Sequence, residues 1–243
     1  MRGYPIGSFL LWTVSPEKAT TFTFYDFLTN YHERNQPYAP PTKIPPGKGA
    51  TAVLDGQQRL TALNIGLYGS HAERLPKKRA NNPEAYPRKR LYLNLLDPAP
   101  EGNEPAMEFD FRFLTDGEAE PEPTEARKWF RVGKILDLKD SGPAAVRELL
   151  DRKIDMNNPE PYERLHKLFW GIRELPAINY YLEPSQDPDK VLDIFVRVNS
   201  AGTVLSYSDL LLSMATNQWK DLDAREEVRS LVKTLKFRLH SAV

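Results

Sequence analysis

The 243-residue chain is 40% hydrophobic, which suffices for the core of one large or two small globular domains. Basic and acidic residues balance at 33 each, so no overall field draws the chain to nucleic acid or to an anionic membrane, and contact with DNA would need a local patch. The absence of cysteine excludes disulfides, thiolate nucleophiles and cysteine-bound zinc. The first apolar run, 9–12, is far too short for a membrane span, so we expect a soluble protein of the cytoplasm.

Short strands, loops and helices alternate in the first half of the chain. Apolar runs bounded by glycine or proline predict strands over residues 5–14 and 50–54. Aromatic and leucine side chains at helical spacing predict a short amphipathic helix over residues 24–31. Residues 37–49 are rich in proline, lysine and glycine and predict an exposed loop. A stripe of leucines predicts a helix over residues 57–69, so the unit is strand, tight turn, helix.

A basic stretch follows this helix, and the prolines within it predict a mobile surface loop rather than a regular element. Two further strands are predicted over residues 91–96 and 109–114, next to acidic linkers rich in proline and glycine. The charged members of the basic stretch are Arg74, Lys77, Lys78, Arg79, Arg88, Lys89 and Arg90.

Helices dominate from residue 144 onward, interrupted by one strand over residues 177–182. We therefore predict an α+β fold, with a mixed sheet in residues 1–140 and a helical region in residues 141–243 that packs on it, as two regions or as one continuous domain. The predicted helices cover residues 144–152, 162–174, 190–198, 207–219 and 225–237.

The corner Asp55-Gly56-Gln57-Gln58-Arg59 between a strand and a helix carries the strongest chemical signal. Gly56 permits a tight turn, and the first free amides of the helix, together with its dipole, favour an anion beyond the helix start. The guanidinium of Arg59 matches phosphate oxygens, and Gln57 and Gln58 can bind a sugar, a base edge or a water. A carboxylate such as Asp55 repels phosphate unless it binds magnesium or orients a water.

A purely structural interpretation of this corner competes with the chemical one. In it Asp55 caps the helix, Gly56 only forms the turn, and Arg59 is a solvated side chain. Corners of this kind are common, and the spacing alone slightly favours the structural interpretation.

A second polar group lies within residues 194–210. Helix capping explains Gly202, Ser206 and Asp209, but it leaves Arg197 and Asn199 unexplained. These two residues could meet the corner across a cleft, with Arg197 as a second phosphate ligand and Asn199 positioning it. Spacing alone again favours the capping interpretation.

Residues 55–60 and 195–209 together resemble the two signature blocks of the GmrSD N-terminal family, and residues 2–7 followed by Trp12 resemble a third. The resemblance extends from Arg2 to about Trp219. It implies a fold similar to that of ParB and sulfiredoxin, in which the corresponding loop and helix start handle nucleotide phosphates. Sulfiredoxin chemistry itself is excluded by the missing cysteine.

The resemblance also implies an activity and its partners. The domain would bind and hydrolyse a nucleoside triphosphate (GTP, ATP or UTP) with magnesium, coupled to recognising modified DNA and to licensing a separate HNH nuclease domain or subunit in phage defence. It implies no metal-ligand residues. On this resemblance the catalytic residues are Asp55, Gln58 and Arg59, and the nucleotide-binding residues are Gly56, Gln57, Arg197 and Asn199.

Two parts of the family pattern are missing from this sequence. An upstream segment with a Gln-Arg and an aromatic-Val-Trp element would precede the Gly-Tyr-Pro block, so an N-terminally truncated, inactive fragment is one alternative. The histidines also lack the spacing of an HNH ββα-metal site, so we do not expect this chain to cut DNA by that route. They are His32, His71, His166 and His240.

Two hypotheses from different classes therefore stand. The first is a nucleoside triphosphatase that gates a DNA-directed effector, and the second is a non-catalytic ParB-like module that binds DNA or a protein. The basic stretch either contacts a phosphate backbone, with salt-sensitive binding, or is a solvated loop neutralised by the acidic linkers. The oligomeric state is not specified by the sequence.

Overall fold

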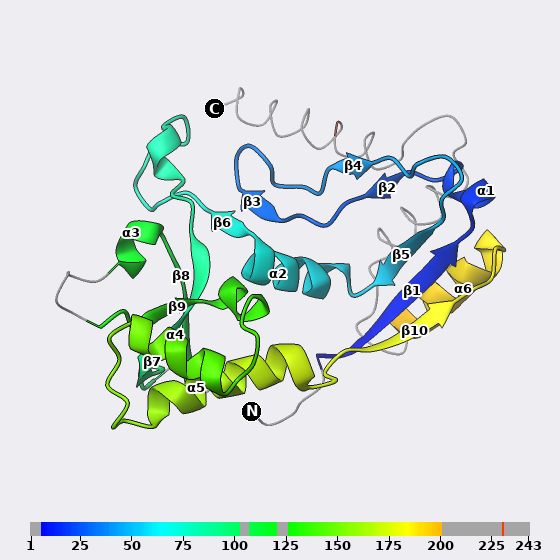
Figure 1. The fold of residues 1–243 in the computed structure, drawn as a ribbon. Helices are drawn as coiled ribbons and strands as arrows, with labels where there is room; N and C mark the ends of the chain where they lie inside the picture. Colours follow the sequence, from blue (N-terminus) through cyan, green and yellow to red (C-terminus); the bar gives the residue numbers. More distant parts are fainter. Residues whose placement is uncertain (1–5, 103–106, 121–125, 201–229, 231–243) are drawn as a thin grey trace.

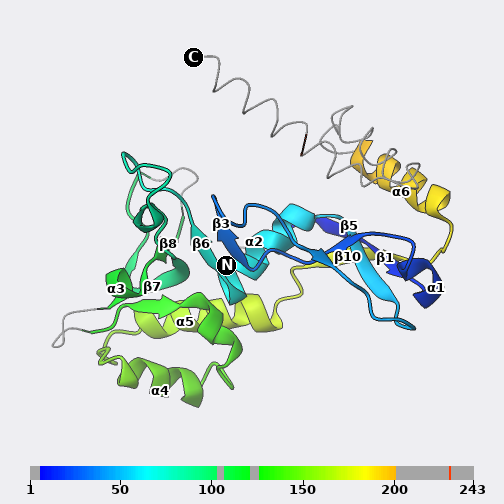
Figure 2. The same cartoon turned by 90° about the horizontal axis from the view of Figure 1, so that it is seen from above.

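A computed structural model describes residues 6–102, 107–120, 126–200 and 230 of the chain. Within these ranges the strands form four small sheets, two of three strands and two of two. Helix α2 (Gln57–Tyr68) lies between the two larger sheets in both Figure 1 and Figure 2. The predicted α+β class is confirmed, but the first half forms several small sheets rather than one, and the ParB-like fold stays a prediction.

One of the larger sheets is mixed and carries the corner at residue 55. Its central strand β1 (Ser8–Val14) runs antiparallel to β5 (Ala50–Asp55) and parallel to β10 (Asn179–Glu183). The pairing of β1 with β5 shifts register between Leu10 and Leu11, directly beside Asp55. Because β10 comes from beyond residue 141, both halves of the chain contribute to this sheet.

The two-stranded sheets lie beside α2 and correct one sequence prediction. Strand β2 (Phe24–Tyr25) pairs with β4 (Pro41–Thr42), and β3 (Asn30–His32) pairs in parallel with β6 (Ser70–Ala72), which follows α2. The helix predicted over residues 24–31 is therefore wrong. Two turns of helix are marginal in isolation, whereas the neighbouring strands provide backbone hydrogen bonds and a surface for the aromatic side chains.

The largest core lies between the second three-stranded sheet and two helices. Strand β7 (Arg90–Pro98) pairs with β8 (Phe109–Leu114) and β9 (Trp129–Arg131), and α4 (Pro143–Asp151) and α5 (Glu160–Phe169) pack against them (Figures 1 and 2). Each fully buried apolar side chain contributes about 1.5–3 kcal/mol of transfer free energy. The most deeply buried members are Leu93, Leu95, Phe130, Ile135, Ala145, Leu149 and Leu165.

The strands predicted over residues 5–14, 50–54, 91–96, 109–114 and 177–182 are confirmed. The helices predicted over 57–69, 144–152, 162–174 and 190–198 are also confirmed. The helix predicted over 162–174 is α5 followed by the π-turn η3 (Trp170–Glu174), and the helix predicted over 190–198 is α6 (Pro188–Ser200). The predicted helices over 207–219 and 225–237, and the capping residues Gly202, Ser206 and Asp209, lie outside the described residues. The sequence prediction missed the strands β4, β6 and β9, of which β4 lies within the loop predicted over residues 37–49. It also missed the short helices α1 (Pro16–Ala19), η1 (Pro83–Ala85), α3 (Asp116–Ala119) and η2 (Val132–Leu136).

A boundary near residue 140 stays a prediction, although α4 and α5 share a core with β7. No helix in the described ranges is long and apolar enough to cross a bilayer.

A buried carboxylate fixes the junction between β10 and α6. The side chain of Glu183 is 2% exposed and accepts hydrogen bonds from Ser185 N (2.8 Å), Tyr181 Oη (3.1 Å) and Lys190 Nζ (3.2 Å). The Ser185 amide, and after it Lys190 and Tyr181, lowers the pKa of Glu183 below its ordinary value. Trp12 Nε1 donates to Ser185 O at 2.7 Å, so the same turn is tied to β1.

We predict that Glu183→Gln weakens the fold at neutral pH and flattens its response to acid. Since the folded-state pKa of Glu183 lies below the ordinary value of 4.5, its contribution is complete above that pH and is lost as the pH falls through the folded-state pKa. Denaturant unfolding measured from neutral pH to about pH 3 should show a steeper loss in the wild type than in the variant. Glu174→Gln, at an exposed residue, is the control. Identical pH profiles for Glu183→Gln and the wild type would contradict this account.

Candidate functional site

The corner at the end of β5 turns sharply because Gly56 adopts a left-handed conformation. Gly56 has φ 89° and is the N-cap of α2, without a side-chain cap hydrogen bond. A β-carbon at this position would lie 2.3 Å from Cδ1 of Phe9, whose ring packs against the turn. Both the backbone angle and the contact therefore require glycine here.

Arg59, in the first turn of α2, binds three oxygen atoms. Its Nη1 donates to Ile6 O at 2.9 Å, and its Nη2 donates to Ser8 O at 2.9 Å and to Asp55 Oδ2 at 3.1 Å. The guanidinium carbon also lies 4.7 Å from the centre of the Phe9 ring. We call these contacts the Arg59 network.

The Arg59 network corrects the purely structural interpretation of the corner in two respects. Asp55 does not cap α2, because the N-cap is Gly56 and the Asp55 carboxylate pairs with Arg59 instead. Arg59 is not merely a solvated side chain, because it joins the start of β1 to the start of α2. With 39% of the Arg59 side chain exposed, the ion pair itself is worth no more than about 1 kcal/mol.

The network also brings two of the sequence blocks together. Gly7 has φ 93°, and a β-carbon there would lie 2.0 Å from Nη1 of Arg59. The block that ends at Gly7 and the block 55–59 are thus parts of one structure, although about fifty residues separate them. Sequence reasoning missed Phe9, whose only signal was its place in an apolar run.

Several polar groups of the corner remain available to a ligand. The first amide of α2 with a helical acceptor is that of Leu60, which donates to Gly56 O at 3.0 Å, so the amides of Gln57, Gln58 and Arg59 have no acceptor inside the helix. Gln57 Nε2 donates to Val53 O at 2.7 Å. The side chain of Gln58 is exposed and makes no hydrogen bond with another described residue.

The structure does not connect Arg197 to the corner. Arg197 lies in the last turn of α6, its side chain is 77% exposed, and its Nε pairs with Asp193 Oδ2 at 3.0 Å within the same helix. Among the described residues, no hydrogen bond or ion pair joins Arg197 to Asp55–Arg59. Asn199 lies in the same turn, and its side chain is outside the described part of the structure.

The two best-defined cavities in the described part of the structure lie away from the corner. Two cavities lie along β3 and β6, and none of their lining residues belongs to Asp55–Arg59. In the described ranges, no group of three or more histidine, aspartate or glutamate side chains is placed to hold a metal ion.

We predict that Gly56→Ala destabilises the fold more than Gly102→Ala. The two glycines have nearly the same φ, 89° and 90°, but a β-carbon at Gly102 meets nothing within 4 Å. The backbone cost of about 1–2 kcal/mol should be common to both variants, and displacement of Phe9 should add about 1–3 kcal/mol at Gly56 only. Denaturant unfolding of both variants measures the difference, and equal losses would show that the Phe9 contact is unimportant.

Comparison with known protein families identifies one that covers most of the chain. No curated protein matches the chain. The family model described as "GmrSD restriction endonuclease, N-terminal domain" matches residues 1–216, which include the corner and all of α6. The resemblance drawn from the sequence blocks is confirmed, and the chain belongs to the GmrSD restriction endonuclease N-terminal domain family.

Proposed function

We propose that this chain is the regulatory, nucleotide-binding domain of a modification-dependent restriction system that acts in the cytoplasm. In this proposal a nucleoside triphosphate with magnesium binds at the start of α2, and its hydrolysis licenses a partner HNH nuclease domain or subunit on DNA. Family membership supports the restriction setting. The nucleotide part of the proposal depends on the corner at Asp55–Arg59.

The geometry of α2 is the observation that carries the nucleotide proposal. Three successive amides without a helical acceptor, at the positive end of a twelve-residue helix, favour a bound phosphate. The exposed amide of Gln58 can bind the ligand or orient a water. Hydrolysis of a bound triphosphate would transfer its terminal phosphoryl group to water and leave a diphosphate and inorganic phosphate, and this chain would hold the nucleotide and place the attacking water.

Within this proposal, the role of Arg59 is primarily to position the corner. Its Nη1 and Nη2 already donate to Ile6 O, Ser8 O and Asp55 Oδ2. These three bonds use three of the five N–H groups of the guanidinium, so a phosphate would bind through the second hydrogen of Nη1 or that of Nε, or else replace one of these acceptors. The Arg59 network holds Asp55 beside the helix start, where the carboxylate can hold a magnesium ion or a water.

A different observation favours a second candidate function, that of a non-catalytic binding module. Arg59 is engaged by protein oxygens, and Arg197 pairs within its own helix rather than facing the corner. A site with neither guanidinium directed at phosphate would lack the usual stabilisation of the transition state.

Phosphate release and nucleotide binding separate the two candidates. GTP, ATP and UTP are each supplied with magnesium, with and without DNA, to the wild type and to Gln58→Ala, Arg59→Ala and Arg147→Ala. We expect Gln58→Ala to lower turnover by about 10²-fold or more without loss of stability, because its exposed side chain makes no hydrogen bond within the described part of the chain. Arg147, exposed on α4, is the control and should keep wild-type turnover.

Arg59→Ala tests positioning against direct catalysis. We expect a lower unfolding midpoint together with lower turnover, since the variant frees the start of β1 from α2. Zero turnover of every triphosphate by a folded wild-type protein that still binds DNA would reject the hydrolytic proposal and leave the binding module.

A further inference from the structure

The basic stretch forms a folded arm over β3 and β6, which we define as residues 73–89. His71 and Lys89 exchange two backbone hydrogen bonds, of 2.8 and 2.9 Å, at its base. Leu75 N donates to Ala85 O at 2.7 Å, and Ala72, Ala85 and Tyr86 form a small buried core. The arm is thus more structured than the loop predicted from the sequence.

This region concentrates positive charge in a chain whose net charge is zero. Residues 30–36 and 70–90 contain eight lysines and arginines against three glutamates. Lys77, Lys78 and Arg79 are exposed, and their side chains make no hydrogen bond or ion pair with another described residue. Arg34 Nη1 donates to Ala80 O at 3.0 Å and so holds the arm against the turn after β3. The acidic linkers therefore do not neutralise the tip of the arm through ion pairs among the described residues.

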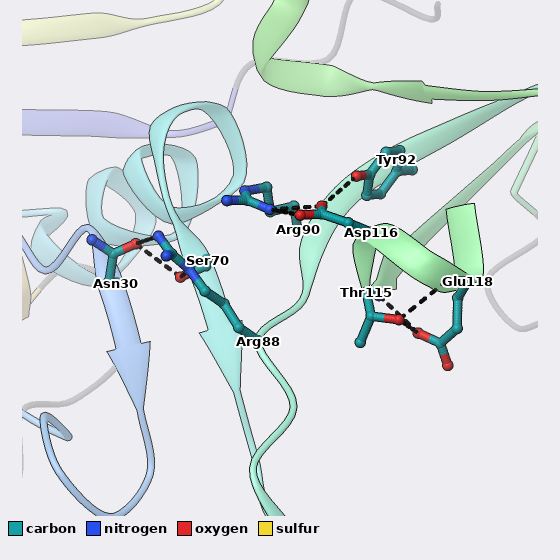
Figure 3. A network of polar contacts seen from close by, with 8 residues as sticks. All are labelled: Asn30, Ser70, Arg88, Arg90, Tyr92, Thr115, Asp116 and Glu118. Atoms are coloured by element: carbon teal, nitrogen blue, oxygen red, sulfur yellow. Dashed lines mark hydrogen bonds and ion pairs between the residues drawn. The ribbon is translucent and has the colours of Figure 1, made fainter. Parts of the chain in front are cut away.

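Arg88, at the base of the arm, is oriented by neutral groups. Its Nε donates to Ser70 Oγ at 3.0 Å and its Nη2 donates to Asn30 Oδ1 at 3.1 Å, as Figure 3 shows. Ser70 itself is 2% exposed and donates to the same Asn30 oxygen at 2.8 Å. Within the described ranges Arg88 has no carboxylate partner, whereas Arg90 pairs with Asp116 at 2.6 Å in the same view. A guanidinium that is held in place without a counter-charge is suited to an anion.

Arg88 lines one of two adjoining cavities. That cavity has a volume of about 240 Å³ and is also lined by Tyr31, His32, Asn35 and Tyr86. The neighbouring cavity, of about 490 Å³, shares the lining residues Asn30 and Gln36 with it, and we call the two cavities together the groove.

Amides and aromatic rings give this groove the chemistry of a nucleotide site. His32 stacks on Tyr86 with ring centres 5.0 Å apart, and its Nδ1 accepts from the amides of Arg34 and Asn35 at 3.2 Å each. Its Nε2 lies 3.4 Å from Nδ2 of Asn35, so both ring nitrogens of His32 have partners in the segment after β3. The exposed side-chain amides of Asn35 and Gln36 can bind a base edge, and the half-buried rings of Tyr31 and His32 line the same groove.

We propose that this groove and the arm bind a DNA strand, with a phosphate on Arg88, one nucleotide in the groove and neighbouring phosphates on Lys77, Lys78 and Arg79. DNA is the partner because the family acts in restriction, and the concave shape suits a nucleotide outside the duplex stack better than a duplex surface. The inference rests on the DNA part of the proposed function and is independent of nucleotide hydrolysis.

Fluorescence anisotropy of labelled DNA tests the proposal on the full 243-residue chain. Single-stranded and duplex DNA, and an RNA strand of the same sequence, are titrated at several salt concentrations with the wild type, Arg88→Gln and the double variant Lys77→Ala/Lys78→Ala. The matched control is Lys139→Ala/Arg147→Ala, which removes two exposed positive charges near and on α4. Thermal unfolding and phosphate release are measured on the same samples, so a failure of the nucleotide proposal is seen separately from a failure of this one.

We expect the arm double variant to lower the salt dependence of binding by about one unit of slope per lost contact, and the control to leave it unchanged. Arg88→Gln should weaken single-stranded DNA binding about tenfold and duplex binding less. Equal losses in the two double variants would overturn the proposal, since net charge alone would then explain binding. Tighter binding of RNA, or of duplex over single strand, would also overturn it. If Arg88→Gln fails to fold, the double variants alone decide the outcome.

Discussion

The guanidinium of Arg59 joins three parts of the chain, and the rest of the candidate site depends on this junction. It joins the backbone of Ile6 and Ser8 to the carboxylate of Asp55 and to the first turn of α2. Because the Arg59 donors are fixed by backbone carbonyls, the start of β1 and the start of α2 have one relative position. The nearby glycines, Gly7 and Gly56, leave room for this guanidinium and for the Phe9 ring. The corner is thus a packed junction as well as a helix start.

Because the corner is both a packed junction and a helix start, its groups divide into those that hold the fold and those that can bind a ligand. A helix start that carries free amides needs a rigid backbone to present them to a phosphate, and the Arg59 network provides that rigidity. The same contacts use three of the five N–H groups of Arg59 and so leave it fewer donors for a ligand. The chemistry proposed for the corner therefore depends more on the amides of α2 and on Gln58 than on the arginine.

Helix α2 also relates the corner to the groove. It begins at the corner and its twelve residues span about 18 Å before β6 begins at Ser70. Midway along it, Asn64 Nδ2 donates to Thr29 Oγ1 at 3.0 Å and so fixes the helix to the segment that enters β3. The proposed nucleotide and DNA surfaces are therefore at the two ends of α2.

The sequence by itself determined the strands and helices with strong periodicity, the strand–turn–helix corner and the family. These depend on local propensity, on glycine at the turn and on motif order, all of which are read along the chain. Only the tertiary structure decided the pairing of β10 with β1, the strands in place of a helix over residues 24–31, and the partners of Arg59 and Arg88. Those contacts join residues far apart in the sequence, so a local sequence pattern carries no information about how much they stabilise the fold. The Arg59 side chain could be identified as important from its position, but whether it binds phosphate or backbone depends on which oxygens the fold brings within its reach.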